Sequence, residues 1–317
     1  MSRILVTGAT GFVGRALCPV LTAAGNSVRA AVRRDGAIPA GALETTVVPD
    51  IGPDTDWRAA LAGIDAVVHL AGRVHVVNED QQAATAHARI NTEGTRRLAE
   101  AAADAGVRRM LFVSSIKVYG DLPDARPLSE SAPPCPDEPY GESKWAAEQA
   151  LMRIGQTRGL ETVVLRPPLV HGPKVVGNML SLLKLCRSGL PLPLGGADNR
   201  RSLIALHNLT DAIRLALQHP AATGQTYVVR DGDDLSVADL IRRLRTSMGL
   251  PARLIAVPPG LLRAGLTMLG RRAMAARLLD SLVLDDAKIR HDLGWIPPLS
   301  VERGLAETVA WFLATAR

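Results

Sequence analysis

The residues that most clearly point to chemistry are a tyrosine and a lysine near the middle of the chain. Tyr140 and Lys144 are four residues apart, so in a helix both side chains lie on one face. An ammonium group beside a phenol favours the phenolate, and we expect Lys144 to lower the tyrosine pKa from about 10. Such a tyrosine can exchange a proton with a sugar or alcohol oxygen while a hydride moves to or from a nicotinamide. A tyrosine–lysine pair alone would equally fit an ordinary surface helix.

A second segment supplies hydroxyl groups to the same chemistry. The apolar run Leu111-Phe-Val ends in Ser114 and Ser115, as a buried strand would end at the edge of a sheet. Open α/β sheets bind their ligands at the carboxyl ends of the strands. Ser115 could hydrogen-bond the oxygen that Tyr140 protonates, although a serine here could also simply cap the strand end. We predict that Ser115, Tyr140 and Lys144 are the catalytic residues.

A glycine-rich turn near the N-terminus has the composition of a phosphate cradle. Gly8, Gly11 and Gly14 follow a short apolar strand and open a helix, with the spacing G-x-x-G-x-x-G. Glycines permit the tight turn, the close approach of a pyrophosphate and the close packing of helix on strand. An ordinary glycine turn is the alternative, and its position in the first strand–helix turn disfavours it. The predicted cofactor contacts here are Gly8, Thr10, Gly11, Phe12, Val13 and Gly14.

The end of the second strand indicates which dinucleotide is bound. An acidic residue there would hydrogen-bond the ribose 2′-hydroxyl of NAD, but the sequence has Arg33 and Arg34. Guanidinium groups suit a 2′-phosphate, so NADP is favoured over NAD, with Arg33 as the predicted contact. The alternative is that Arg33 and Arg34 are solvent-exposed loop residues with no role in cofactor binding.

These side chains need a scaffold that brings strand ends together, and the first half of the sequence predicts one. Short apolar runs alternate with helical segments, which is typical of βαβ units and a parallel sheet. We predict an α/β fold with a Rossmann-like doubly wound parallel sheet over residues 1–166. The expected strands are 4–7, 28–32, 46–49, 66–71, 110–114 and 162–166, and the expected helices are 12–24, 57–62, 83–105 and 140–157.

The second half of the sequence has a different pattern, because strands and helices no longer alternate and residues 167–173 and 190–201 are rich in proline and glycine. We predict a smaller C-terminal α/β substrate domain over residues 167–317, which can return a strand or helix to the first domain. The expected strands are 203–206 and 226–229, and the expected helices are 237–248 and 301–314.

Composition excludes several classes of protein. The 317 residues are 47% hydrophobic and 21% charged, which is typical of a globular chain. Aromatic residues make up 3% and no long basic run occurs, so nucleic acid is not an expected partner. The three cysteines lack metal-ligand spacing, and we expect free thiols, no metal site and a reducing compartment. No apolar stretch is long enough for a membrane span, so we expect a cytoplasmic protein.

Taken together, these motifs resemble the extended short-chain dehydrogenase/reductase family of nucleotide-sugar epimerases, dehydratases and reductases. The resemblance runs along nearly the whole chain, and the joint pattern is far more specific than any part. In chain order the matching pieces are Gly8-x-x-Gly11-x-x-Gly14, Asp50-Ile51, His69-Leu-Ala-Gly72, Asn91-x-x-Gly94-Thr95, Ser114-Ser115-x-x-Val-Tyr-Gly120, Tyr140-x-x-x-Lys144 and Arg166-Pro167.

The resemblance implies roles for further residues. Lys144 would also hold the nicotinamide ribose, and Asn91 would steady the central helix near it. The other implied cofactor contacts are Asp50 and Ile51 at the adenine, Leu70, Ala71 and Gly72 along the cofactor, Tyr140, and Pro167 beside the nicotinamide. The implied contacts to a UDP-sugar are Ser115 at the sugar, Asn178 and Arg201 at the diphosphate, and, more loosely, Arg277.

Within this family, one bacterial branch resembles the chain most. Ser143-Lys-Trp145, Pro191-Leu-Pro-Leu-Gly195 and the segment 199–209 resemble the branch that reduces a UDP-4-keto-6-deoxy-N-acetylhexosamine to UDP-N-acetylquinovosamine for O-antigen or other lipopolysaccharide. The alternative is a UDP-hexose 4-epimerase that retains NAD, and a more distant one is a non-catalytic dinucleotide sensor. The resemblance also implies a homodimer formed through the helices 83–105 and 140–157.

One basic stretch stands outside these motifs. Residues 254–279 contain four arginines and no acid, with apolar residues between them, as in an amphipathic helix. A helix whose apolar face packs on the substrate domain is the favoured interpretation. Contact with a membrane surface is the alternative.

Overall fold

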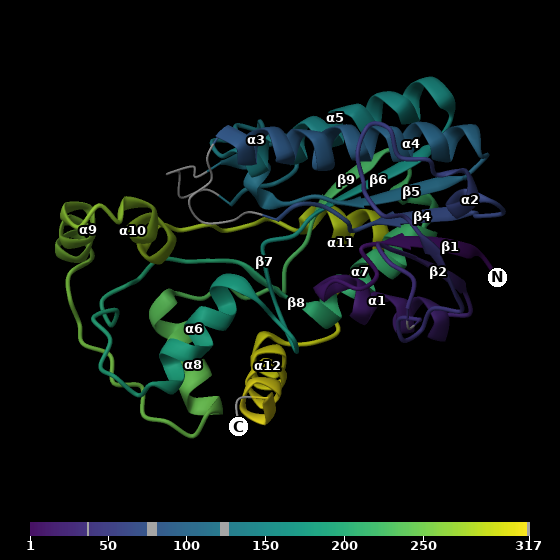
Figure 1. Cartoon of the computed structure of the whole chain (residues 1–317). Helices are drawn as coiled ribbons and strands as arrows, with labels where there is room; N and C mark the ends of the chain where they lie inside the picture. Colours follow the sequence, from purple (N-terminus) through teal and green to yellow (C-terminus); the bar gives the residue numbers. More distant parts are fainter. Residues whose placement is uncertain (37, 75–80, 121–126, 316–317) are drawn as a thin grey trace.

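The computed structural model describes residues 1–36, 38–74, 81–120 and 127–315, and its central feature is a parallel sheet of seven strands (Figure 1). The strand order is β3-β2-β1-β4-β5-β6-β9, and every pairing is parallel. This confirms the predicted doubly wound sheet. Its strands are β1 (Arg3–Thr7), β2 (Ser27–Val32), β3 (Glu44–Val47), β4 (Ala66–His69), β5 (Arg109–Val113), β6 (Glu161–Arg166) and β9 (Gln225–Val228).

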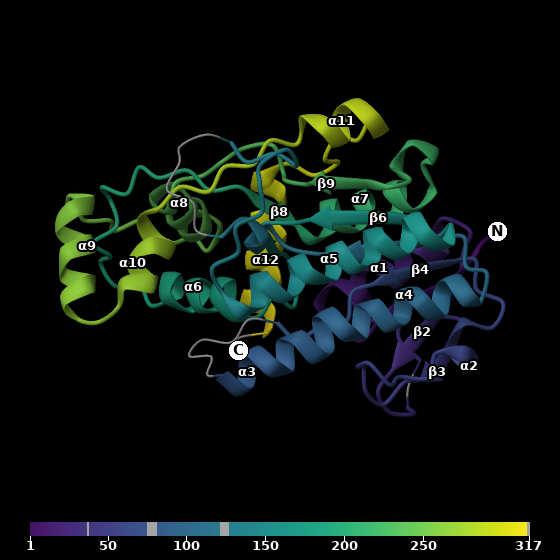
Figure 2. The ribbon, with the colours of Figure 1, turned by 90° about the horizontal axis from the view of Figure 1, so that it is seen from above.

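Helices cover both faces of this sheet, and each face has its own apolar core (Figure 2). The inner strands β4 and β5 are buried along almost their whole length, as continuous apolar runs predict for a sheet covered on both sides. One face packs against α1 (Phe12–Ala23), α7 (Leu206–Gln218) and α11 (Ala287–Leu293). The other packs against α2 (Arg58–Leu61), α4 (Gly94–Asp104) and α5 (Pro139–Arg158).

The rest of the second half forms a smaller lobe with a separate apolar core. Its elements are β7 (Leu169–His171), β8 (Leu203–Ala205), α6 (Gly177–Arg187), α8 (Val237–Ser247), α9 (Pro259–Met268), α10 (Arg272–Leu279) and α12 (Val301–Thr315). Strand β9 and helices α7 and α11 come from the second half but belong to the sheet. The domain boundary at residue 167 stays a prediction. After residue 167 the chain returns from the smaller lobe to the sheet at α7, β9 and α11.

Two predicted helices differ from those observed. The expected helix 83–105 is divided, because a π-helical segment at Ala88–Glu93 separates α3 (Gln81–His87) from α4. The expected single helix in 254–279 is a pair, α9 and α10, because Gly270 adopts a left-handed conformation that ends the first helix. Across the described residues, no helix is both long and apolar enough to span a bilayer.

Candidate active site

The glycine turn lies between β1 and α1 and packs too closely for side chains. Gly8 has φ +70°, and a Cβ there would lie 2.8 Å from the amide nitrogen of Ala71. A Cβ on Gly14 would lie 2.3 Å from the Gly8 carbonyl oxygen, so helix and strand are in direct backbone contact. Gly11, which bonds back to the Gly8 oxygen over 2.9 Å, begins α1 without a side-chain cap. The first turn of α1 therefore presents backbone donors, which suits a pyrophosphate.

Three predicted contacts in this turn would act through their backbone. Phe12 packs against the apolar core of the smaller lobe, and Val13 packs against the core of the sheet. The carbonyl oxygen of Thr10 accepts a hydrogen bond of 2.7 Å from Arg15. The side chains of Phe12 and Val13 therefore anchor the helix between the two cores.

The second strand ends with the basic pair at the same edge of the sheet. Arg33 and Arg34 follow β2, and both are exposed. Asp50 lies close enough to feel the charge of Arg33, and its carboxylate forms an ion pair of 2.8 Å with Arg89. The hydrogen bond from Arg89 lowers the pKa of Asp50. Ile51 packs on the backbone of Gly94, which ties this adenine-side loop to α4.

A buried histidine fixes the loop after β4. The Nδ1 atom of His69 lies 2.6 Å from the Thr7 hydroxyl, and its Nε2 lies 3.0 Å from the Thr95 hydroxyl. Burial, with the charge of Lys144, lowers the pKa of His69 to about 3, so this imidazole is neutral. Thr7 also accepts a hydrogen bond of 3.2 Å from the Ala71 amide. The network holds the segment Leu70-Ala71-Gly72 against the glycine turn.

The three predicted catalytic residues meet at the carboxyl end of β5. Tyr140 and Lys144 lie in the first turns of α5, and Ser115 follows β5 and hydrogen-bonds Tyr140. The Lys144 ammonium donates to the Val113 carbonyl over 2.9 Å and lies 4.4 Å from the centre of the Phe112 ring. Ser115 also caps the turn that follows, accepting a hydrogen bond of 3.2 Å from the Lys117 amide. The structure therefore brings these three residues together as the sequence spacing predicted, and Ser115 also caps the strand end. Their catalytic role stays a prediction.

The protonation states differ from the expectation. Burial raises the pKa of Tyr140 to about 12, and the hydrogen bond to Ser115 lowers it only in part. Burial also lowers the pKa of Lys144 to about 8, against an attraction from Glu148. The predicted lowering of the tyrosine pKa by Lys144 is wrong for this structure, because burial of the phenol dominates and raises that pKa. Tyr140 is held as a phenol, which is the form that donates a proton.

Asn91 lies in the π-helical segment between α3 and α4 and makes hydrogen bonds to Ser143 and Arg73. Its amide nitrogen donates to the Ser143 hydroxyl over 3.0 Å and to the Arg73 carbonyl over 3.0 Å. Its carbonyl oxygen accepts from the Arg73 amide over 2.7 Å. A Cβ on Gly72 would lie 2.9 Å from that same oxygen, so glycine is required beside it. Asn91 thus joins the cofactor-side loop to the catalytic helix.

The sheet edge fits a dinucleotide. The glycine turn leaves room that Cβ atoms would fill, and the buried Ser114 hydroxyl has no hydrogen-bond partner among the described residues. Pro167 is buried at the end of β6, and its carbonyl accepts a hydrogen bond of 3.2 Å from the Ile116 amide. Ser114 and Pro167 follow β5 and β6, and Lys144 bonds the last residue of β5. Arg33 and Asp50 follow β2 and β3.

The predicted substrate residues lie in the smaller lobe and are not brought into one cluster. Asn178 is exposed in the first turn of α6. The backbone of Arg201 forms isolated β-bridges with Leu235 and Leu282. Its guanidinium donates a hydrogen bond of 2.9 Å to the Asp280 carbonyl. Arg277 is half-buried in α10, three residues before Asp280. Arg201 and Arg277 therefore share a neighbourhood around Asp280.

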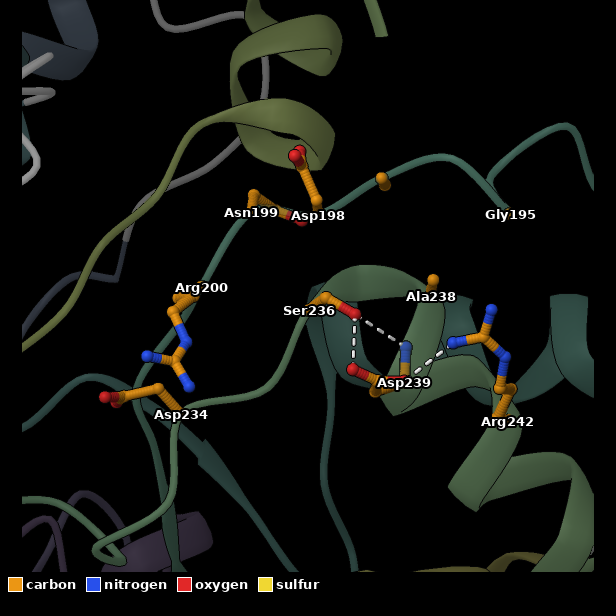
Figure 3. Close-up of a pocket in the computed structure, with 10 residues that line it drawn as sticks. Gly195, Asp198, Asn199, Arg200, Asp234, Ser236, Ala238, Asp239 and Arg242 are labelled. Atoms are coloured by element: carbon orange, nitrogen blue, oxygen red, sulfur yellow. Dashed lines mark hydrogen bonds and ion pairs between the residues drawn. The ribbon is translucent and has the colours of Figure 1, made fainter. Parts of the chain in front are cut away.

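A cavity of about 330 Å³ lies beside this neighbourhood (Figure 3). It is lined by Asp198, Asn199 and Arg200 on one side and by Ser236, Asp239 and Arg242 of α8 on the other. Ser236 caps α8 and Asp239 pairs with Arg242 over 2.6 Å, so these charges are satisfied within the wall. Arg200, rather than the predicted Arg201, lines this cavity.

A buried polar cluster that sequence reasoning did not assign lies between the sheet and the lobe. His171 bonds Asp231 over 3.0 Å and Thr308 of α12 over 3.2 Å. Asp231 accepts hydrogen bonds from the Ala205 amide and from Asn208. His69 and His171 are positioning residues whose roles became recognisable only with the fold, whereas the sequence analysis predicted that Asn91 would steady the central helix.

Comparison with known proteins identifies the family. The NAD dependent epimerase/dehydratase family matches residues 4–229. The chain is 35% identical to a UDP-glucose 4-epimerase of Vibrio cholerae, covering 98% of this chain and 95% of that one. It is 27% identical to an N-acetyl-alpha-D-glucosaminyl-diphospho-ditrans,octacis-undecaprenol 4-epimerase of Escherichia coli O157:H7, covering 99% and 96%.

A solved structure agrees with these relatives. A short-chain dehydrogenase/reductase superfamily protein from Agrobacterium tumefaciens with bound NAD superposes with a TM-score of 0.76 at 25% identity, covering 99% of this chain and 98% of that one. Fold, glycine cradle and family match agree, and the chain is therefore an enzyme of the NAD dependent epimerase/dehydratase family.

Proposed function

We propose that this enzyme prefers NADP and reduces the C4 ketone of a UDP-4-keto-6-deoxy-N-acetylhexosamine, a step in making surface polysaccharide. The observation that carries the proposal is the meeting of Ser115, Tyr140 and Lys144 at the carboxyl end of β5, beside the glycine turn. The exposed Arg33 and Arg34, placed where an NAD enzyme would have an acid, support NADP.

The mechanism assigns one task to each side chain. The glycine turn and Lys144 would hold a nicotinamide cofactor, which would supply the hydride for C4 of the sugar. Tyr140 donates its phenolic proton to the C4 oxygen, so the ketone becomes an alcohol. Ser115 hydrogen-bonds the same oxygen and orients it, and Lys144 stabilises the phenolate left on Tyr140. Asn91 holds Ser143 and thereby the turn of α5 that carries Tyr140 and Lys144.

The smaller lobe would hold the nucleotide diphosphate. Guanidinium groups pair with phosphate oxygens in a bidentate manner, which suits Arg201 and Arg277 near Asp280. Asn178 at the start of α6 would add an amide donor. We also infer a cytoplasmic homodimer, supported by the free cysteines and by the neighbouring helices α4 and α5.

A second candidate is a 4-epimerase that retains NAD and acts on a UDP-hexose. The 35% identity with the Vibrio cholerae UDP-glucose 4-epimerase favours it. The same triad would serve both directions of hydride transfer, with Tyr140 accepting the proton in the oxidation. The basic pair after β2 is the feature that separates the two candidates.

The test begins with the absorbance and mass of any nucleotide that copurifies with the protein. NADPH oxidation is then followed with a UDP-4-keto-6-deoxy-N-acetylhexosamine, with NADH in parallel. The double variant Arg33→Ala, Arg34→Ala should lower kcat/KM for NADPH by about tenfold or more and leave NADH little changed. A protein that carries NAD, ignores NADPH and interconverts UDP-glucose with UDP-galactose would overturn the reductase proposal and establish the epimerase.

A further inference from the structure

The helix pair formed by α9 and α10 is the most unusual surface of the molecule. Figures 1 and 2 show the pair at the end of the smaller lobe farthest from the sheet. No residue of α9 is buried, although eight of its ten residues are apolar or glycine. A helix that is apolar nearly all round is expected in a core or against a membrane, not in water.

The two sides of α9 differ in what they contact. Leu262 packs against the core of the smaller lobe, and Leu266 is half-buried on the same side. Leu261, Gly265 and Met268 follow one another at helical spacing on the outer side. Leu261 is 67% exposed and Met268 88% exposed. The helix thus has a second apolar face that nothing among the described residues covers.

The outer surface continues beyond α9. Leu269 is 73% exposed in the turn that follows, and Met274 of α10 is 43% exposed. Ile255, before α9, is 54% exposed. We call Ile255, Leu261, Met268, Leu269 and Met274 the outer apolar patch.

The sequence segment that carries the outer apolar patch has charged residues of one sign only. The forty residues between Asp239 and Asp280 contain eight arginines and no aspartate, glutamate or lysine. Arg271, just before α10, and Arg272, the first residue of α10, are exposed and have no acidic partner in the described part of the chain. Arg242, Arg243 and Arg263 are different, because they form ion pairs with Asp239, Glu302 and Asp280.

This combination points to one occupant. Apolar side chains beside unpaired arginines match an anionic lipid surface, where apolar groups enter the acyl boundary and arginines meet phosphates. A second copy of the chain fits less well, since a two-fold contact would bring the same arginines of both copies together. At about 1.5 Å per residue, α9 is about 15 Å long, half the thickness of the bilayer core, so it would lie in the interface.

We propose that the α9–α10 pair is a docking surface for an anionic phospholipid bilayer. The outer apolar patch would enter the bilayer interface, and Arg271 and Arg272 would contact lipid phosphates. The proposal is independent of which reaction the active site performs, because none of these residues belongs to the catalytic or cofactor groups. It favours membrane contact, the alternative for the segment 254–279, over a segment that serves only to cover the substrate domain.

The experiment is cosedimentation of the full-length protein with vesicles. Vesicles of equal parts phosphatidylcholine and phosphatidylglycerol are compared with vesicles of phosphatidylcholine alone. The protein should sediment with the anionic vesicles and not with the neutral ones, and raising the salt to about 0.5 M should release it. Absence of sedimentation with anionic vesicles, or equal binding to both compositions, would overturn the proposal.

Matched variants separate the contribution of the apolar side chains to vesicle binding from that of the arginines. The double variants Leu261→Ser, Met268→Ser and Arg271→Ser, Arg272→Ser should each lower the partition coefficient by about tenfold or more. The controls Ile296→Ser and Arg303→Ser remove an exposed apolar side chain and an exposed arginine elsewhere, and should bind as the unmodified chain does. Equal binding by all four variants would contradict the proposal.

Two further readouts keep the result interpretable. Circular dichroism and turnover of soluble substrate should be unchanged in every variant, which shows that folding and the active site are intact. Light scattering measures the oligomeric state and so tests whether a second copy of the chain covers the outer apolar patch. An oligomer that dissociates in the Leu261→Ser, Met268→Ser variant, with no vesicle binding by the unmodified chain, would assign the patch to a second copy and overturn the proposal.

Discussion

The sheet half and the smaller lobe hold their candidate residues in different ways. In the sheet half, Thr7, Ser115 and Pro167 lie at or just beyond the carboxyl ends of β1, β5 and β6. The ladder of parallel strands fixes where those ends meet, so distant residues gather at one edge. In the lobe, Arg201 is held by isolated bridges and Arg277 by a short helix. The strand order of the sheet positions the residues of the sheet half, and local contacts position those of the smaller lobe.

The difference has a consequence for function. Hydride and proton transfer require fixed geometry, and the rigid sheet edge supplies it. In the proposed function, recognition of the nucleotide sugar depends on the lobe, whose segments can vary while the sheet stays the same. Relatives with different substrates can therefore share one catalytic edge. Variants in the two regions should accordingly fail in different ways.

The largest expected effect is on chemistry at the sheet edge. Tyr140→Phe removes the proton donor while the ring stays in place, so turnover should fall by about 10² to 10⁴-fold. Cofactor affinity should change little, because the glycine turn and Lys144 remain. Steady-state kinetics and a titration of cofactor binding measure the two effects. A variant that retains turnover within a few-fold would remove Tyr140 from the mechanism.

The next effect is a pH dependence of stability due to Lys144. Burial lowers the pKa of Lys144 from 10.5 to about 8, so between these values the unfolded chain binds a proton that the native chain lacks. The contribution of Lys144 to the free energy of unfolding therefore rises as the pH increases above 8, and it is lost as the pH falls toward 8.

The matched comparison is with Lys144→Met, which cannot titrate. From pH 8 to pH 10 the unfolding free energy of the unmodified enzyme should rise by about 2 kcal/mol relative to that variant. Urea unfolding at several pH values measures the difference, and the shared Tyr140 cancels in it. A constant difference across this range would contradict the account of Lys144.

A pair of glycine substitutions compares backbone packing in the two regions. A Cβ at Gly14 would lie 2.3 Å from a carbonyl oxygen, so Gly14→Ala should lower the unfolding free energy by about 1–3 kcal/mol and weaken cofactor binding. Gly265 of α9 has nothing within 4 Å of such an atom, and Gly265→Ala should stabilise the helix by about 0.5–1 kcal/mol. Urea unfolding tests both, and equal effects would show that the two sites are packed alike.

The smallest expected effect concerns substrate binding in the lobe. Arg201→Ala should raise KM for the UDP-sugar by about tenfold and leave kcat nearly unchanged, because it removes a charged contact to the diphosphate. Arg200→Ala is the matched neighbour. If Arg200→Ala raises KM and Arg201→Ala does not, the diphosphate contact belongs to the residue that lines the cavity in Figure 3.

Much of the fold and the catalytic edge could be predicted from the sequence because their signals are local. Continuous apolar runs such as β4 and the spacing of Gly8, Gly11 and Gly14 depend on a few neighbouring residues. The positions of Tyr140 and Lys144 on one helical turn are equally local. These features depend on residues that are close together in the sequence, so patterns in the chain report them directly.

Other features depend on tertiary contacts and were not predicted. The π-helical segment around Asn91 exists together with bonds to Arg73 and Ser143, which come from elsewhere in the chain. The raised pKa of Tyr140 reflects burial, whereas spacing alone suggested the opposite shift. The two faces of α9 likewise became distinguishable only when Leu262 was placed against the lobe.

The most direct test of the central claim follows the hydrogen that is transferred. The enzyme is supplied with NADPH deuterated at nicotinamide C4, on the transferred face, and with a UDP-4-keto-6-deoxy-N-acetylhexosamine. The reductase account predicts one deuterium at C4 of every product molecule and an equal amount of NADP⁺. Turnover of a nucleotide sugar without deuterium in the product and without net consumption of cofactor would contradict it.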